Sequence, residues 1–254
     1  MIRLLEGIVD RGSPVSANRT LALVSKVFNY GIDQEIVEVN PTQRVKPPAK
    51  EKSRDCVLKK HEIRAVWRAL EEEDPVVAGM FKLRLPTAQR GIEVFSMRWS
   101  DIDGEWWTIP AEVSKSGLPH RVPLSPQTLA ALELLRPLSG DSEWVFDSPK
   151  KPGTHIVAIR KAAVRIAERT GVSFTAHDLR RTAATHMAGM GVSRVTISKI
   201  LNHVERGITT IYDRAIYDRA SYDAEKRRAL RRWGEKVASI GSNRDELAPV
   251  VPIR

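Results

Sequence analysis

Apolar residues near the start of the chain recur at the spacing of an amphipathic helix. Residues 1–39 follow this pattern, with Leu21, Val24 and Phe28 at positions i, i+3 and i+7 of one stripe. Asn40-Pro41 is expected to end the helix, because the residue before a proline is driven out of the α region. A piece this short is too small to form an independent core. It is therefore expected to pack against something else or to belong to a longer domain.

The pattern breaks after this helical piece. Residues 42–55 read TQRVKPPAKEKSRD, a stretch rich in Pro and Lys that is typical of a linker. Apolar positions return at 59–72, where a helix is predicted. We therefore divide the chain into a partial helical domain (1–45), a linker (46–56), a main domain (57–240) and a flexible tail (241–254).

The main domain combines helices with one β segment. Residues 106–110 and 120–124 read as strands joined through the Lys115-Ser116-Gly117 turn, and Asp103-Gly104 indicates another turn just before them. Ser125-Pro126 opens a helix as its N-cap and first helical residue. The predicted fold class is α+β, mainly α, with a small antiparallel sheet and further helices at 154–170, 177–190, 193–201 and 222–238.

Charge favours a polyanionic partner. Across 254 residues, 41 Lys and Arg stand against 31 Asp and Glu, a net charge of +10, which favours nucleic acid ahead of acidic membranes. A basic surface kept for solubility is the alternative. The chain has no apolar run long enough to span a membrane and no secretory signal, and its single cysteine, Cys56, excludes a disulfide framework. A soluble cytoplasmic protein is the expectation.

The densest group of candidate chemical residues is His177-Asp178-Leu179-Arg180-Arg181-Thr182. His177 and Arg180 lie three residues apart and share a helix face, where a guanidinium and an imidazole can bind an anion together. A surface arginine pair in a first helical turn is the alternative. His186 lies on the opposite side of the helix and is expected to stand outside this site.

Three more segments carry candidate residues. Arg90 is followed three residues later by Glu93, which can hold its guanidinium still or form an ordinary helical ion pair. His203 ends a short apolar helix, and Tyr212 follows nine residues later. The sequence Ile-Tyr-Asp-Arg-Ala then occurs twice in tandem, at 211–215 and 216–220, so that Tyr217 repeats Tyr212.

These segments, taken in order, resemble the tyrosine recombinase (phage integrase) family. The sequence has the family's Arg in TxxRxxE, a Lys in a turn between strands, HxLRRT, L-x-H, and a Tyr nine residues beyond that His. The resemblance runs from about Val15 to Trp233 and is closest to integrases of prophages and genomic islands. It implies a catalytic domain of the DNA breaking-rejoining type, preceded by the last helices of a core-binding domain at residues 1–45, whose remainder is absent. Asn202 stands where many relatives have Gly, and no role is assigned to it.

The resemblance also implies roles for the residues. Arg90 and Arg180 would neutralise the phosphate oxygens with His203 as a third donor, and Glu93 would support Arg90. His177 would act as the acid/base partner of the tyrosine, and Lys115 would protonate the departing 5′-oxygen. The product is a 3′-phosphotyrosyl link, and the chemistry requires no metal, cofactor or ATP.

The nucleophile is expected to be Tyr212, because it has the family's separation from His203. Tyr217 is the alternative, since it has the family's usual relation to Ser221-Tyr222-Asp223 in the C-terminal helix. Five residues on a helix turn through about 140°, so one geometry does not present both tyrosines.

The implied partners are double-stranded DNA at attachment sites and further copies of the chain, in a homotetramer that forms on DNA. The apolar stripe of Leu230, Trp233 and Val237 packs either on its own domain or, as in the family, on a neighbouring protomer. One alternative function is a truncated DNA-binding remnant, weak or inactive in catalysis. A type IB topoisomerase-like enzyme is another. A metal-dependent nuclease is a third, but the sequence contains no cluster of metal-ligating residues to support it.

Overall fold

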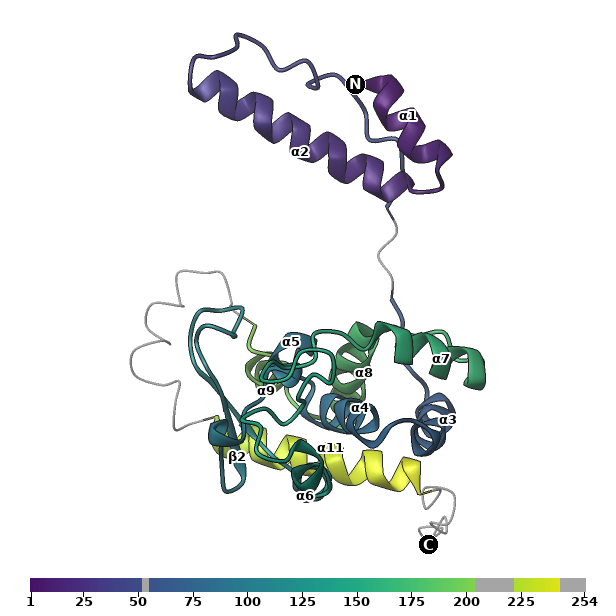
Figure 1. Cartoon of the computed structure of the whole chain (residues 1–254), viewed down its shortest axis with the longest axis vertical. Coiled ribbons are helices and arrows are strands. Elements are labelled where there is room, and N and C mark those ends of the chain that lie inside the picture. The colour runs from purple at the N-terminus through teal and green to yellow at the C-terminus, as the bar shows by residue number, and fades with distance from the viewer. Residues whose placement is uncertain (52–54, 204–221, 243–254) are drawn as a thin grey trace, which may run out of the picture. The chain divides into compact units, whose positions relative to one another are not determined.

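The chain divides between Asp55 and Cys56 into two units, Met1–Asp55 and Cys56–Arg254. The structure is a computed structural model that describes residues 1–51, 55–203 and 222–242 (Figure 1). The sequence interpretations for Tyr212, Tyr217 and the tail from 243 onward lie outside these described residues. Each unit is described by itself below.

The first unit is an antiparallel pair of helices, α1 (Ile2–Asp10) and α2 (Pro14–Asp33). Its small core consists of Leu5, Ile8, Ala17 and Leu21. Of the stripe expected on α2, Leu21 is buried, whereas Val24 and Phe28 are only half-buried. Four buried side chains make only a small core, and whether this unit folds alone stays a prediction.

The expected end of α2 at Asn40-Pro41 is wrong. The helix ends at Asp33 because Glu35 adopts a left-handed conformation with φ of 55°. The Ile36 amide then donates to Gly31 O at 2.8 Å and the Glu35 amide donates to Ile32 O at 2.9 Å, the paired bonds of a Schellman C-cap. This turn needs no proline, and a glutamate in the left-handed conformation is not expected from residue type.

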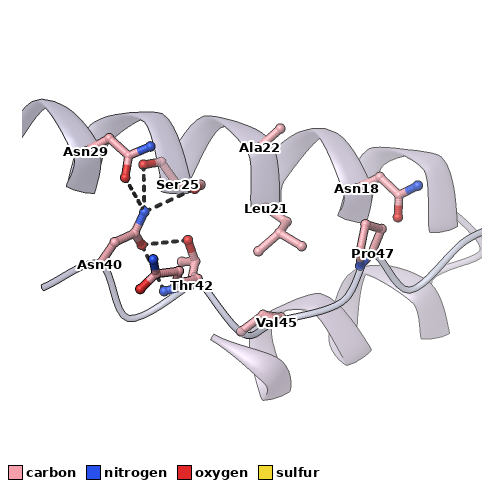
Figure 2. Close-up of a pocket in the computed structure, with 10 residues that line it drawn as sticks. Asn18, Leu21, Ala22, Ser25, Asn29, Asn40, Thr42, Val45 and Pro47 are labelled. Carbon is pink, nitrogen blue, oxygen red and sulfur yellow. Dashed lines mark hydrogen bonds between the residues drawn. The ribbon is translucent and has the colours of Figure 1, made fainter.

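Asn40 instead fastens the following segment onto α2. Its amide donates to Asn29 Oδ1 at 2.6 Å and to Ser25, while its carbonyl oxygen accepts from the backbone and side chain of Thr42 (Figure 2). Farther along, the Asn18 side chain bonds both backbone groups of Ala49. The first part of the Pro- and Lys-rich stretch therefore lies along α2, and the two together line a shallow pocket, with Leu21 on the helix and Val45 on the stretch.

The second unit is mainly helical with one small antiparallel sheet, as predicted. The helices predicted at 59–72, 177–190, 193–201 and 222–238 and the helix opened by Ser125 are all present. Within the described residues its helices are α3 (Lys60–Ala69), α4 (Pro75–Thr87), α5 (Gly91–Phe95), α6 (Pro126–Ser139), α7 (Arg160–Thr170), α8 (Ala176–Gly189), α9 (Arg194–Ile200) and α11 (Asp223–Gly241), with 3₁₀ turns at Leu70–Glu72 and Trp99–Asp101.

The sheet has the order β1 (Ile102–Asp103), β2 (Trp106–Ile109), β3 (His120–Pro123). Trp107 pairs with Val122 and Ile109 pairs with His120, and all four side chains are buried on one face. The loop between β2 and β3 carries Lys115, as the sequence predicted. The turn expected at Asp103-Gly104 joins β1 to β2.

Two helices differ from the sequence interpretation. The helix expected from 154 begins only at Arg160, because residues 154–156 pair in extended form with 146–148, including Ile156 N to Phe146 O at 2.9 Å. Helix α4 was not predicted at all. Its residues from Ala78 to Thr87 are buried all round, except the half-buried Lys82, so no polar face reveals the helical period.

Helix α11 runs across the second unit past α4 and α6 (Figure 1). Leu230, Trp233 and Val237 are each no more than 1% exposed, and the Trp233 indole donates to Leu85 O at 2.9 Å. The stripe therefore packs in the core of its own unit, the first of the two explanations given above. No helix in the described ranges is both long enough and apolar enough to cross a membrane.

Candidate functional site

The site is organised around the C-terminal end of α9. Asn202 has a φ of 48°, and this left-handed residue closes the helix in a Schellman motif. Its amide donates to Lys199 O at 3.2 Å, and the His203 amide donates to Ser198 O at 3.1 Å. The motif explains an Asn at a position where Gly is common, because Asn tolerates the left-handed region better than other non-glycine residues. His203 follows directly and is exposed.

Three consecutive backbone carbonyls at this helix end accept hydrogen bonds from distant segments. Ile200 O accepts from the Gln89 amide at 2.9 Å and from His120 Nε2 at 3.1 Å. The next two carbonyls, of Leu201 and Asn202, accept from two arginines described below. The end of α9 is thus joined to the loop after α4, to β3 and to α8. Figure 1 shows α5, α8 and α9 grouped in this part of the unit.

Arg90 stands at the N-cap of α5 and is held by Glu93. The Arg90 backbone amide donates to Glu93 Oε2 at 2.7 Å, and its Nη1 donates to Oε1 at 2.8 Å. Glu93 is 1% exposed, so the carboxylate of this ion pair is shielded from solvent, whereas the Arg90 side chain is 21% exposed. A longer contact of 3.5 Å joins Arg90 Nη2 to Asn202 O.

Arg180 on α8 is buried, at 4% exposed, and its guanidinium bridges two helix ends. Nη1 donates to Ala88 O at 2.7 Å at the end of α4, and Nη2 donates to Leu201 O at the end of α9. Burial, and next the charge of Arg90, lower its pKa to about 10. It therefore stays protonated at neutral pH.

Both arginines keep donors for an anion. A guanidinium carries five N–H groups, and the bonds described here engage only one N–H on each Nη atom. Among the described residues, the carboxylate that acts on both Arg90 and Arg180 is that of the buried Glu93, so two guanidiniums stand against one negative charge. Such a cluster is suited to a phosphate group.

Two further predicted residues lie at the rim of this cluster. His203 is partly desolvated, and this burial, followed by the charges of Arg180, Arg90 and Lys115, lowers its pKa. Lys115, exposed on the β2–β3 loop, is therefore close enough to act on His203 electrostatically. The structure brings together Arg90, Glu93, Arg180, His203 and Lys115 around the end of α9.

His177 lies one turn before Arg180 on α8, on its exposed side. Partial burial and then the charges of Arg84 and Arg180 lower its pKa, so its imidazole is neutral at neutral pH and free to take up a proton. His186 lies elsewhere, as predicted. Its ring stacks on Trp233 with centroids 5.4 Å apart, and its Nε2 lies 2.8 Å from Leu58 O.

Sequence reasoning missed Arg84, a third arginine of the site. It lies on α4, is 5% exposed, and its Nε has no hydrogen-bond partner among the described residues. Burial lowers its pKa to about 10, whereas the charge of Glu93 raises it. Gly91 makes room for it, because a Cβ there would come within 2.9 Å of Arg84 Nη1. An arginine inside an otherwise apolar run is the signal that could have identified it.

His120 was also missed. It is 8% exposed, and because Ile200 O can only accept a hydrogen bond, the proton of the neutral ring lies on Nε2. Burial, and next the charge of Lys226, lower its pKa from 6.5 to about 4. His120 lies in a strand in which apolar and polar residues alternate, so nothing in its sequence context distinguishes it from an ordinary core residue.

This pKa predicts an acid-sensitive fold. Below pH 6.5 His120 becomes protonated in the unfolded chain, whereas in the folded chain it stays neutral down to about pH 4. The contribution of neutral His120 to the free energy of unfolding is thus complete above pH 6.5, and it declines by up to about 3 kcal/mol towards pH 4. Urea unfolding followed by tryptophan fluorescence measures it, because all six tryptophans lie in the second unit.

The His120→Gln variant keeps an N–H donor for Ile200 O and should lose less stability between pH 7 and pH 4.5 than the wild type. The control is His61→Gln, at an exposed histidine on α3, which should follow the wild type. Parallel pH profiles for wild type and His120→Gln would contradict the assignment.

No group of three His, Cys, Asp or Glu side chains suited to a metal ion occurs within 1–51, 55–203 and 222–242. Tyr212 and Tyr217 lie outside these ranges, so the nucleophile remains a prediction from the sequence.

Comparison with known proteins places these residues in context. Residues 56–219 match the model of the phage integrase family. The prophage integrase IntA of Escherichia coli K12 is 34% identical over 61% of this chain and 37% of its own length, and IntZ of the same strain is 30% identical over 81% and 52%. The chain thus spans about half or less of the length of these relatives.

The fold is similar to that of lambda integrase. A dimer of lambda integrase residues 75–356 bound to a COC′ core site aligns with a TM-score of 0.66 and 22% identity, over 80% of this chain and 77% of that one. A lambda integrase tetramer bound to a Holliday junction aligns with the same TM-score and 21% identity, over 80% and 63%. At this level of identity the likeness establishes the fold, and it agrees with the expected catalytic fold.

Proposed function

The chain belongs to the phage integrase family, and on that premise we propose that it is a site-specific DNA recombinase that integrates or excises a mobile element. It acts through a covalent 3′-phosphotyrosyl intermediate. Its site of action is the nucleoid in the cytoplasm.

One observation carries the proposal: Arg90 and Arg180 are anchored at the same helix end, beside the buried carboxylate of Glu93. A phosphodiester carries one negative charge, and its pentacoordinate transition state carries about two. The remaining N–H groups of the two guanidiniums match the non-bridging oxygens, and the His203 ring adds a donor at the rim. Because the helix ends and Glu93 hold both arginines in advance, little reorganisation accompanies the reaction.

The reaction balances without a cofactor. The oxygen of Tyr212, or of Tyr217 in the alternative, attacks phosphorus and forms the Tyr–O–P bond, while its phenol proton passes to His177. The bond from phosphorus to the 5′-oxygen breaks, and Lys115 supplies the proton that this oxygen needs to leave as a hydroxyl. The bond energy remains in the phosphotyrosyl link, so attack by another 5′-hydroxyl reverses the step and joins the strands.

Double-stranded DNA at attachment sites is the proposed partner, consistent with the net charge of +10. Exchange between two duplexes requires several active sites, so we also propose a homotetramer on DNA. Lambda integrase provides the parallel, as a tetramer on a Holliday junction. The apolar face of α11 around Trp233 is buried in its own unit, so protomers must meet through other surfaces.

Covalent trapping tests the proposal. The substrate is a pool of nicked duplexes of randomised sequence, in which the strand released by cleavage is short enough to diffuse away. In buffer with EDTA, the wild type should form a denaturant-resistant protein–DNA adduct. Tyr212→Phe should abolish it, and Tyr217→Phe should leave it.

The other outcomes of the trapping experiment distinguish between the alternative nucleophile and the alternative functions. Loss only in Tyr217→Phe keeps the enzyme and replaces the nucleophile. DNA binding with no adduct from any form supports the non-catalytic alternative. Relaxation of supercoiled DNA without exchange between two duplexes supports a topoisomerase-like enzyme instead.

A further inference from the structure

The residue between the helix end and His203 makes contacts that its sequence position did not suggest. The Asn202 side-chain amide donates to Ser114 Oγ at 2.9 Å and to Ser116 Oγ at 3.2 Å. The two serine hydroxyls are themselves 2.9 Å apart. These serines flank Lys115 on the β2–β3 loop.

We propose that Asn202 is a positioning residue that clamps the Lys115 turn onto the end of α9. This inference rests on the proposed function, in which Lys115 protonates the 5′-oxygen. It assigns to this chain a side-chain link that a glycine at the same position does not provide.

The clamp joins two groups that must act on one phosphate. The backbone oxygen of Asn202 accepts from Arg90, while its side chain holds the turn. Asn202 thus holds the turn of Lys115 at the same helix end that anchors both guanidiniums. Asn202 has a left-handed φ of 48°, and its side-chain amide reaches the loop at Ser114 and Ser116.

The other hydrogen bonds of the turn among the described residues lie mostly within the loop itself, including a weak contact of 3.4 Å from Leu118 N to Ser116 Oγ. Within it, Gly117 N donates to Ser114 O at 2.9 Å, and Ser114 N donates to Pro110 O at 3.0 Å. Ser114 is buried, but Lys115 and residues 117–119 are exposed. Loss of the two amide bonds should therefore release the loop while β2 and β3 stay paired.

Asn202→Gly removes the clamp cleanly, because glycine adopts the same φ without strain and keeps the carbonyl that accepts from Arg90. Without DNA, limited trypsin digestion read by mass spectrometry should show cleavage after Lys115 accelerated about tenfold, the effect of losing two hydrogen bonds on local opening. Ser114→Ala combined with Ser116→Ala should act alike, and adding Asn202→Gly should have little further effect. The control is Ser100→Ala, at an exposed serine outside the loop.

The second readout is chemical. A substrate recovered from the trapping pool is prepared with sulfur in place of the bridging 5′-oxygen, and a thiolate leaves without a proton. Asn202→Gly should slow adduct formation about tenfold on the oxygen substrate and less than twofold on the sulfur substrate. Lys115→Ala should show the same pattern with a larger loss on oxygen.

Equal slowing on both substrates means that Asn202 only supports the fold, and this overturns the proposal. Unchanged trypsin cleavage also overturns it. A wild type that traps no substrate from the pool contradicts the proposed function, and the trypsin rates then decide the clamp alone.

Discussion

Arg180→Ala is expected to lower the rate of adduct formation by at least about a thousandfold. Loss of one preorganised donor costs about 10² to 10³ in rate, and loss of an arginine that neutralises a phosphoryl transition state costs about 10³ to 10⁵. Arg180 combines both effects, because its buried guanidinium also holds Ala88 O and Leu201 O in place. DNA affinity should fall less than about tenfold, since many phosphate contacts share it.

A methylphosphonate substrate separates chemistry from folding. Replacing a charged phosphate oxygen by a methyl group removes the partner of a guanidinium, so the penalty for Arg180→Ala should shrink on this substrate. Arg68→Ala, at an exposed arginine on α3, is the control and should keep the wild-type rate on both. An equal penalty on both substrates would mean that Arg180 only braces the helix ends.

Glu93→Gln is expected to destabilise the second unit by about 3–5 kcal/mol, the usual cost of removing one partner of a buried ion pair. Glu93 accepts two hydrogen bonds from Arg90 and also lies within electrostatic reach of Arg84 and Arg180. Its neutralisation leaves three cations without the carboxylate that compensates them. Urea unfolding followed by tryptophan fluorescence measures the loss.

The chain offers a matched control for this substitution. Glu62 occupies the same capping position in α3, where its Oε2 accepts from Lys59 N at 2.7 Å, but this contact is exposed. Glu62→Gln should cost no more than about 1 kcal/mol. In an Arg84→Met background the loss caused by Glu93→Gln should shrink, because one uncompensated cation is gone. Similar losses for the two glutamates would contradict the charge balance described here.

The sequence predicted those parts of the structure in which polar and apolar positions differ. This contrast between a buried and an exposed side is present in the strand pair around Trp107 and Val122 and in the helix of Trp233. The Ser125 cap was predicted from its residue type. Helix α4 has no such contrast, and Arg84 within it was overlooked for the same reason. The end of α2 was misplaced because a left-handed Glu35, rather than proline, stops the helix.

The site was predictable as a list of residues and not as an arrangement. The order of motifs pointed to Arg90, Arg180 and His203, but nothing in it indicates that three consecutive carbonyls at the end of α9 bind the distant segments. Backbone acceptors leave no mark on the sequence. Asn202 was passed over for a related reason, since its conformation explains the residue type and only tertiary structure reveals where its amide binds.

The central claim is that a tyrosine following His203 attacks a phosphate held by Arg90 and Arg180. The most direct test is peptide mapping of the trapped adduct after nuclease and trypsin digestion. Cleavage after arginine and lysine separates the candidates, with Tyr212 in peptide 207–214, Tyr217 in 215–219 and Tyr222 in 220–226. We predict a nucleotide mass on peptide 207–214 from the wild type and none from Arg180→Ala. A mass on 215–219 would move the nucleophile to Tyr217, and unmodified peptides from a stable adduct would contradict the mechanism.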